Sequence, residues 1–295
     1  MIVAIGLDVD DTFAWFVHHA LEAGVTLRCI NLRAAGGAWR FDLPPAGPAR
    51  IEQAGDVLAL GPEDAYYCRL IDLSAMENDP AMVRRWRALI CGLRAWLDAV
   101  PGRVANRPSR CAHNSSKPLH EAVLRDLGLR VPDSVTSSDP EVLRAFVLEG
   151  PTISKTICGT RAETTVVTEE DFAIFDPASG PVHLQRYVAG DDVRIHVAGE
   201  GTVAQVAQAG AIDYRRAGAI AGMKVFEPPT ALRHLVVEAT SQLGLGFAGW
   251  DFKIDADGTY WCLEANPMPG YSAYDSRCEG AISHALRRYL DPDSP

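Results

Sequence analysis

Residues 250–267 read WDFKIDADGTYWCLEANP, a pattern that predicts a β-hairpin with one acidic residue on each arm. The Asp257-Gly258 pair is typical of a two-residue hairpin turn. Counting back from that turn along both strands places Asp251 directly opposite Glu264. Directly opposed residues of antiparallel strands share one face of the sheet, with Cβ atoms roughly 5 Å apart.

A third oxygen donor, Asn266, falls on the same face, because side chains two residues apart in a strand point the same way. Two carboxylates brought together repel each other unless a cation lies between them. Oxygen donors without a neighbouring His or Cys suit Mg²⁺, which keeps water and substrate phosphate among its ligands. The hairpin therefore predicts a site for magnesium and phosphate, with Asp251, Glu264 and Asn266 as ligands.

Composition excludes several classes of protein. The chain has 295 residues, enough for two or three subdomains. Its net charge of −10 and pI near 5.3 argue against a nucleic-acid partner, since such binding depends on basic surface. There is no run of about 18 apolar residues, and the first residues, MIVAIGLD, lack the basic region of a signal peptide. We therefore expect no membrane span, no secretion and a cytoplasmic location.

The cysteine and lysine contents are also informative. Seven cysteines, an odd number without a closely spaced pair, predict buried small side chains rather than disulfides or zinc ligands. The 28 basic residues include only four lysines: Lys117, Lys155, Lys224 and Lys253. Genome base composition is the simplest cause of this bias. Even so, the remaining lysines are candidates for binding phosphate as compact point charges.

The N-terminal part predicts an open α/β domain. An apolar strand at residues 2–6 is followed by an amphipathic helix at 13–23 and a second strand at 25–30. The turn after the first strand has no glycine-rich fingerprint, which argues against a Rossmann dinucleotide site. A long helix from Pro80 to about Val100 precedes an expected boundary at Pro101-Gly102.

The rest of the chain alternates short helices and strands. Helices are predicted at 117–128, 139–149, 229–243 and 278–290, and strands at 152–157, 164–168, 183–188 and 192–198, besides the hairpin. Histidines 183 and 196 lie on these strands, where a structural role is more common than a role as a base.

Several segments of this part have features of a nucleotide site. Lys155 lies in a strand of β-branched residues, and the loop after it, with Gly159 and Arg161, could donate backbone N–H groups to phosphates. An ordinary hairpin turn with an exposed lysine is the alternative. Further along, Asp192 could hydrogen-bond a ribose, and Arg194 shares its strand face.

Together these segments resemble the ATP-grasp carboxylate–amine ligases, in particular the RimK-like branch and the peptide-cyclising ligases of graspetide (microviridin-type) biosynthesis. The resemblance is strongest over residues 104–275 and looser over the first 100 residues. It rests on an ordered set of segments: 106–108, 114–118, 128–132, Lys155 with its loop, 185–194, 213–215 and 263–270.

The resemblance implies a fold and its division. The fold would be the α/β ATP-grasp fold, with an N-terminal open α/β domain at residues 1–103. A central subdomain at 104–188 and a C-terminal subdomain at 189–295, both α+β, would clamp ATP between them.

The resemblance also implies roles for individual residues. Those that would hold the nucleotide are Lys117, Lys155 and Gly159 at the phosphates, Gln185, Arg186, Tyr187 and Val188 at the adenine, and Asp192 at the ribose. Asp251, Glu264 and Asn266 would carry two Mg²⁺ ions, with Glu264 bridging them. Arg194 and Arg215 would neutralise charge on the transferring phosphoryl group and on the acyl phosphate.

Two positions depart from the family pattern. The loop after Lys155 carries a single glycine, where many members have a glycine-richer lid. Trp250, directly before Asp251, is bulkier than the small aliphatic residue expected there, and we interpret it as core packing.

The implied activity is ATP-dependent ligation. ATP would activate a substrate carboxylate as an acyl phosphate, and an amine or hydroxyl, which a precursor peptide could supply, would displace phosphate to give an amide or ester. Such phosphoryl transfer needs positioning and charge neutralisation rather than a protein nucleophile. The alternatives are a ligase of free amino acids or dipeptides, and a kinase or a non-catalytic nucleotide-binding module on the same scaffold. The resemblance is compatible with a homodimer.

Overall fold

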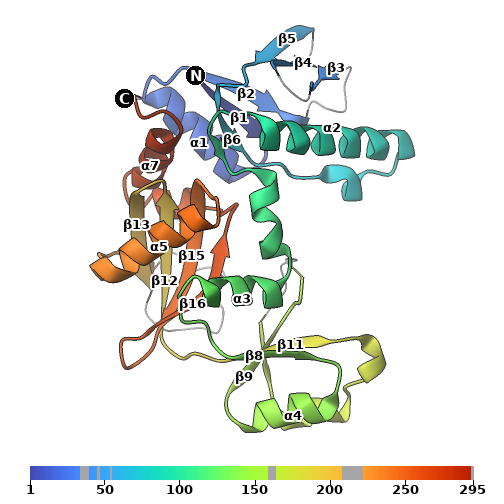
Figure 1. Ribbon diagram of the computed structural model, residues 1–295, viewed down its shortest axis with the longest axis vertical. Coiled ribbons are helices and arrows are strands. Elements are labelled where there is room, and N and C mark those ends of the chain that lie inside the picture. The colour runs from blue at the N-terminus through green and yellow to red at the C-terminus, as the bar shows by residue number, and fades with distance from the viewer. Residues whose placement is uncertain (34–39, 45–46, 54, 159–163, 208–221, 294–295) are drawn as a thin grey trace.

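The computed structural model describes residues 1–33, 40–44, 47–53, 55–158, 164–207 and 222–293. In Figure 1 an N-terminal α/β part lies at the top, a five-stranded sheet in the middle and a small four-stranded sheet at the bottom. No helix in these ranges is long and apolar enough to cross a membrane.

A parallel sheet with the strand order β2-β1-β6-β7 forms the N-terminal part. Its strands are β1 (Ile2–Gly6), β2 (Leu27–Asn31), β6 (Ala65–Cys68) and β7 (Val104–Ala105). The apolar run of β1 serves both faces: Val3 and Ile5 pack in one core with α2 (Pro80–Ala99), while Ile2 and Ala4 pack in another with α1 (Asp11–Glu22). A three-stranded antiparallel sheet lies beside it, made of β3 (Arg40–Asp42), β4 (Ala49–Gln53) and β5 (Asp56–Leu60).

The small central sheet is antiparallel, with the order β10-β9-β11-β8. Its elements are β8 (Ser134–Ser137), α4 (Pro140–Leu148), β9 (Thr152–Lys155), β10 (Thr165–Val167) and β11 (Val182–Arg186). The helix α3 (Lys117–Asp126) lies between this sheet and the five-stranded sheet (Figure 1).

The five-stranded antiparallel sheet has the order β14-β13-β12-β15-β16. Its strands are β12 (Asp191–Ala198), β13 (Gly201–Ala207), β14 (Lys224–Val225), β15 (Phe247–Ile254) and β16 (Tyr260–Asn266). Helix α5 (Thr230–Gln242) packs on its apolar face, and α7 (Ala281–Leu290), preceded by the short α6 (Ser272–Asp275), packs with α1 in the second core. Figure 1 accordingly shows α7 between the N-terminal part and this sheet.

Segments of 3₁₀ helix, three to eight residues long, complete the described elements: η2 (Leu73–Met76), η3 (Pro108–Ser115), η4 (Glu169–Ala173) and η5 (Pro177–Ser179). The predicted long helix is confirmed at Pro80–Ala99, and Trp250 is confirmed as a core residue, fully buried beside Phe252. The cysteines are all free, but the prediction that they are buried is wrong for Cys29, Cys91 and Cys158, which are exposed.

Candidate active site

The opposition of the two hairpin carboxylates is confirmed, because Asp251 on β15 pairs with Glu264 on β16. The turn is not the predicted one. A two-residue turn would pair Ala256 with Thr259, whereas the backbone N–H of Asp255 donates to Thr259 O at 3.1 Å and the loop holds three residues. Gly258 closes this loop at φ +78°, a left-handed conformation that glycine adopts without a steric penalty.

A second irregularity restores the register. From Ile254 to Phe252 the ladder is one residue out of step with the prediction, and a β-bulge between Phe252 and Asp251 adds one residue, Leu263, to β16. The two departures cancel. Glu264 therefore lies where the sequence analysis placed it, although the counting from the turn was wrong.

One face of the five-stranded sheet is polar, because the strand period brings charged residues to the same side. Asp192 and Lys253 are directly paired across β12 and β15, and their Oδ1 and Nζ atoms lie 2.8 Å apart. Arg194 and Asp251 form the next pair, with Nη1 and Oδ2 2.7 Å apart. All four residues are at most 4 % exposed, so each charge is compensated by its neighbour rather than by water.

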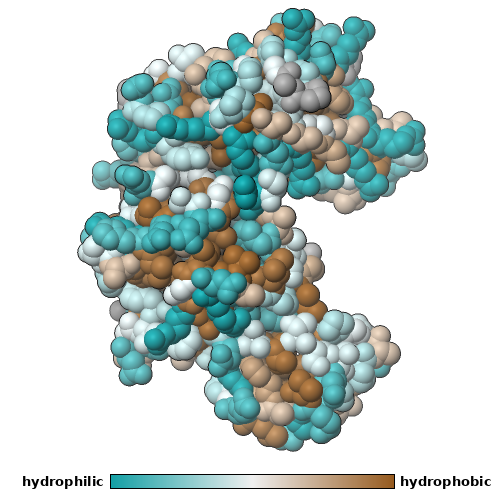
Figure 2. All heavy atoms as spheres, viewed as in Figure 1, coloured by the Kyte–Doolittle hydropathy of each residue, from teal (hydrophilic) through white to brown (hydrophobic). Residues whose placement is uncertain are grey.

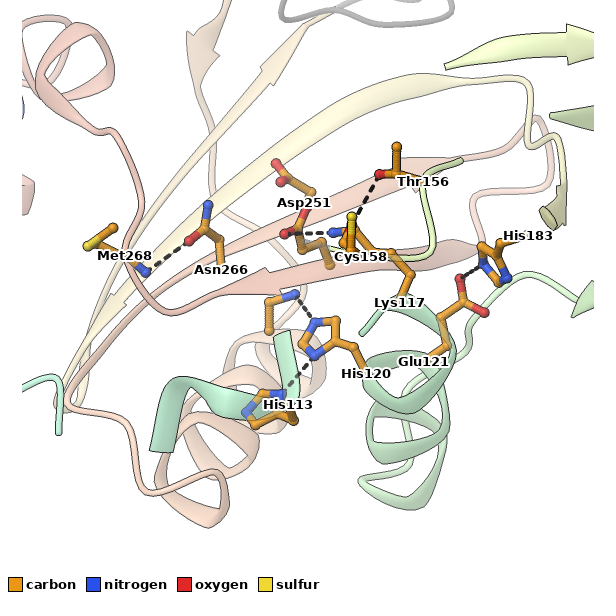
Figure 3. A network of polar contacts seen from close by, with 12 residues as sticks. His113, Lys117, His120, Glu121, Thr156, Cys158, His183, Asp251, Asn266 and Met268 are labelled. Atoms are coloured by element: carbon orange, nitrogen blue, oxygen red, sulfur yellow. Dashed lines mark hydrogen bonds and ion pairs between the residues drawn. The ribbon is translucent and has the colours of Figure 1, made fainter. Parts of the chain in front are cut away.

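Lys117 reaches the polar face from the start of α3 (Figure 3). Its Nζ lies 3.0 Å from Glu264 Oε1. Its own backbone N–H donates to Ile157 O at 2.8 Å, just beyond β9, so the helix start is fixed to the strand that carries Lys155. Lys155 lies at the end of β9 rather than in mid-strand. The two lysines thus reach one place from two different elements.

A cleft of about 580 Å³ brings the two lysines together with Glu264. The predicted site residues among its lining are Lys117, Lys155, Glu264 and Asn266. The N-terminal part contributes cations too, Arg69 and Arg94. Figure 2 shows the surface hollowed between the N-terminal part and the lower lobe. Among the described residues, the lining therefore contains four cations against one carboxylate, a balance that suits an anionic ligand.

The predicted adenine hinge lies apart from this lining. Gln185 is fully buried, and its Nε2 donates to Glu121 Oε1 at 2.6 Å. The side chain of Arg186 turns away to α4, where Nη2 lies 2.6 Å from Glu149 Oε2. Tyr187 and Val188 line a second hollow of about 280 Å³, with Pro132, Asp133, Asp255 and Trp261 among its walls.

Two of the predicted residues, Gly159 and Arg215, lie outside the described residues, as does the 213–215 segment. Asp192, Arg194 and Asp251 are described but do not line the cleft, since all three are engaged in the ion pairs of the polar face.

The donor set fits Mg²⁺ bound through phosphate. In the described part of the chain no group of three or more His, Cys, Asp and Glu residues could hold a metal by itself. The hairpin offers two carboxylates and the amide of Asn266, whose Oδ1 accepts the N–H of Met268 at 2.9 Å. Mg²⁺ is usually bound by few protein oxygens, and phosphate oxygens complete its coordination shell.

Sequence reasoning missed the residues that hold this site in place. Asn106 accepts the backbone N–H groups of Gly246 and Phe247 and donates to the carbonyls of Phe247 and Pro267, so it ties both ends of the hairpin together. Arg69 joins Asp10, at 2.6 Å, to the carbonyl of Pro269, at 2.9 Å. Asn106 belonged to a segment of the family resemblance, whereas nothing in the sequence distinguished Arg69 from other arginines.

Glu121 and His120 of α3 were also missed. Glu121 accepts hydrogen bonds from His183, Gln185 and Ser134. Burial alone would raise the pKa of this carboxyl, but the bonds from His183 and Ser134 outweigh it and lower the pKa. His120 points the other way, toward β16, and its contacts are described below.

No family model matches the sequence. Among curated proteins, N-acetylaspartylglutamate synthase A of Mus musculus is 23% identical over 208 residues, 65% of this chain and 55% of that protein. Beta-citrylglutamate synthase B of Homo sapiens is 24% identical over 209 residues, 65% of this chain and 54% of that protein. The chain spans about half the length of these relatives.

Solved structures match over nearly the whole chain. The ATP-grasp ligase PsnB, complexed with a minimal precursor, has a TM-score of 0.80 at 26% identity and covers 98% of both chains. The macrocyclase MdnC of Microcystis aeruginosa, bound to its precursor peptide MdnA, has a TM-score of 0.81 at 18% identity, over 99% of this chain and all of that one. A RimK-domain ATP-grasp protein of Sphaerobacter thermophilus has a TM-score of 0.60 at 18% identity, over 98% and 99% of the two chains.

The chain therefore has the ATP-grasp fold, as the sequence predicted. Within that class, ligases solved with a precursor peptide match it from end to end.

Proposed function

We propose that the protein is an ATP-dependent ligase that activates a carboxylate as an acyl phosphate and joins it to an amine or hydroxyl. The observation that carries the proposal is the opposed pair Asp251 and Glu264, with Lys117 held on Glu264 and Lys155 in the same cleft. No cysteine, serine or histidine is needed as a nucleophile in this chemistry.

When bound, Mg²⁺ and ATP supply the phosphoryl group and neutralise its charge. Asp251, Glu264 and Asn266 would hold the metal, and we infer two ions from the resemblance to the family. Lys117 and Lys155 would orient the phosphates, and Arg194 and Arg215 would neutralise charge at the transferring group. The cations of the N-terminal part, Arg69 and Arg94, face the same cleft and suit an acidic substrate.

A precursor peptide is the favoured substrate. PsnB and MdnC, solved with precursor peptides, match this chain over at least 98% of its length, whereas the curated synthases match only 65%. The division into units at 1–103, 104–188 and 189–295, a cytoplasmic location and a homodimer are further parts of the proposal. Light scattering tests the last of these.

The deciding experiment separates ligase, kinase and binding module. The protein is incubated with Mg²⁺, ATP and either acidic peptides or a panel of amino acids, while ADP, free phosphate and product mass are followed. A ligase releases ADP and phosphate together and gives a product lighter by one water. Release of ADP with a stable phosphorylated product would indicate a kinase, and nucleotide binding without turnover would indicate a binding module.

Variants tie the activity to the site. Glu264→Gln should reduce Mg²⁺-dependent turnover at least a hundredfold while far-ultraviolet circular dichroism stays unchanged, because the amide cannot neutralise a metal. Lys155→Ala should weaken ADP binding about tenfold. Glu141→Gln, an exposed change on α4, is the control. Retained turnover in Glu264→Gln would remove the metal assignment.

A further inference from the structure

The strand that carries Glu264 and Asn266 is an outer strand of the described sheet, because β16 follows β15 at one end of the order β14-β13-β12-β15-β16. The outward N–H groups of such a strand need acceptors from elsewhere. That of Cys262 donates to the carbonyl of Arg130 at 2.7 Å. That of Ala265, between the two predicted ligands, donates to His120 Nε2 at 2.9 Å.

The imidazole of His120 has one orientation and one tautomer. An amide can only donate, so Nε2 accepts and the ring proton lies on Nδ1. That nitrogen is 2.9 Å from His113 Nδ1, which therefore accepts (Figure 3). The two rings are almost parallel, 8° apart in plane with centroids at 5.0 Å. His113 thus fixes the tautomer and the ring orientation of His120. Hydrogen-bond partners fix metal-bound histidines in the same way, although the group held by His120 is a backbone N–H.

The helix that carries His120 also carries the cation of the site. Lys117 lies three residues earlier on α3, and its Nζ contacts Glu264. Residues three apart lie on one side of a helix. One face of α3 therefore holds β16 twice, through the side chain of Glu264 and through the backbone of Ala265.

We propose that His120 is a positioning residue of the metal strand, that is, of β16 with the predicted ligands Glu264 and Asn266. Its Nε2 atom holds the peptide unit between Glu264 and Asn266, so that both side chains stay directed at the face shared with Asp251. The expected effect on metal binding rests on the proposed function, whereas the role of His120 in holding the backbone of Ala265 does not depend on it. The strand ends at Asn266, and the residue after it, Pro267, has no N–H. If the bond from Ala265 to His120 were lost, Pro267 could therefore not donate a bond in its place.

A histidine that merely fills the core would act through its shape, whereas a positioning histidine acts through its acceptor. The matched variants are His120→Gln, whose Oε1 reaches about as far as Nε2 and can accept, and His120→Met, of similar length without an acceptor. Exchange of the Ala265 amide is measured in the protein without metal or nucleotide. ADP affinity is then measured by calorimetry with and without Mg²⁺.

The expected result separates the two variants. In His120→Met the Ala265 amide should exchange about tenfold faster or more, and the part of ADP affinity that depends on Mg²⁺ should fall about tenfold. ADP binding without Mg²⁺ should stay within twofold of the parent, and His120→Gln should keep both properties. Unchanged exchange in His120→Met, an equal loss of affinity with and without Mg²⁺, or an equal defect in His120→Gln would each overturn the proposal.

Two further observations keep the test decisive. If His120→Met fails to fold, His113→Leu removes the partner of Nδ1 and should speed exchange of Ala265 in the same direction; no change there would overturn the proposal. If the parent protein binds no ADP with Mg²⁺, the proposed function fails. The exchange of Ala265 in the variants still decides the role of His120.

Discussion

At the scale of single residues, the site compensates its own charges. Asp251 contacts Arg194 at 2.7 Å and Glu264 contacts Lys117 at 3.0 Å, so neither carboxylate depends on a metal for a counter-charge. Binding of a metal–phosphate ligand would then be an exchange of partners. The carboxylates would turn to the metal, and the freed cations would turn to the phosphates.

This exchange predicts opposite effects of one substitution. Lys117→Met removes the competitor for Glu264, so Mn²⁺ used in place of Mg²⁺ should bind the nucleotide-free protein about fivefold more tightly, the equivalent of roughly 1 kcal/mol. ADP with Mg²⁺ should bind about tenfold more weakly, since a charged hydrogen bond to phosphate is lost. Electron paramagnetic resonance and calorimetry measure the two constants. Lys224→Met, an exposed lysine on β14, is the charge-matched control. Weaker Mn²⁺ binding in Lys117→Met would contradict the exchange.

His120 predicts a dependence of stability on pH. Burial and then the neighbouring His113 lower the pKa of His120 to about 4; Lys117 lowers it further, while the nearby carboxylates of Glu264 and Glu121 oppose this shift. The folded state thus prefers the neutral ring, so this stabilisation is complete above about pH 6.5 and is lost as the pH falls toward 4, to a total of about 3 kcal/mol. Urea unfolding of the metal-free protein between pH 7 and 4.5 should show the loss, and His120→Gln should show less of it. Parallel curves for the two proteins would contradict the prediction.

What the sequence could predict at this scale was residue type and face, not distance. Glu264 and Lys117 were both assigned to the site, yet their contact was not foreseen, because they are 147 positions apart in the sequence (264 minus 117). Lys253 was noted only as one of four lysines, and its pairing with Asp192 appears once β12 and β15 are seen to be neighbours.

At the scale of elements, α3 joins two sheets. Neighbouring residues on a helix point about 100° apart, so His120 faces β16 while Glu121 faces the central sheet. Glu121 accepts hydrogen bonds from His183 and Gln185 of β11 and from Ser134 of β8. The predicted nucleotide hinge and the predicted metal strand are therefore fixed to one rigid helix.

The joint makes Glu121→Gln a sensitive substitution. An amide would direct an N–H₂ group toward side chains that already donate, and the free energy of unfolding should fall by about 1–3 kcal/mol. Urea denaturation followed by circular dichroism measures it. Glu141→Gln, an exposed change on α4, should stay within about 0.5 kcal/mol of the parent. Equal stability of the two variants would mean that the buried network contributes nothing.

Elements with a clear period or clear ends were predicted well, as for the helix at Pro80–Ala99, which begins with proline after a capping Asp79. Strands β3, β6 and β13 are among those that were not predicted. β3 and β6 have only three and four residues, too few for a period to be visible, and β13 reads GTVAQVA, with small residues in place of a β-branched run.

At the scale of the whole molecule, a few polar contacts attach the N-terminal part to the site. Arg69 follows β6 and joins Asp10, beyond β1, to the segment after β16. Asn106 follows β7 and binds both ends of the hairpin. Both residues lie at carboxyl ends of parallel strands, where open α/β sheets commonly place ligands. The cleft therefore depends on contacts between parts that are far apart in the sequence, and these the sequence could not reveal.

Removing the contacts of Arg69 should destabilise the folded protein. Arg69→Met leaves Asp10 partly buried without its counter-charge and should reduce the free energy of unfolding by about 3 kcal/mol. Proteolysis within 267–270 should also become faster. Arg33→Met is the control, because Arg33 pairs with Asp8 at 3.6 Å on the exposed surface and should change stability by less than 1 kcal/mol. A similar small effect for both variants would show that Arg69 does not hold the parts together.

The cancelling turn and bulge of the β15–β16 hairpin have a consequence for sequence alignment. A relative with a two-residue turn and no bulge would present the same ligand pair over the same number of residues, because it would have one residue fewer in the loop and one more paired residue on the arm of β15, while Leu263 would be paired instead of bulged. An alignment that places its gap by turn length alone would then shift Glu264 onto the wrong column. Relatives should therefore be aligned on each strand separately, with any gap allowed at Leu263 as well as in the loop.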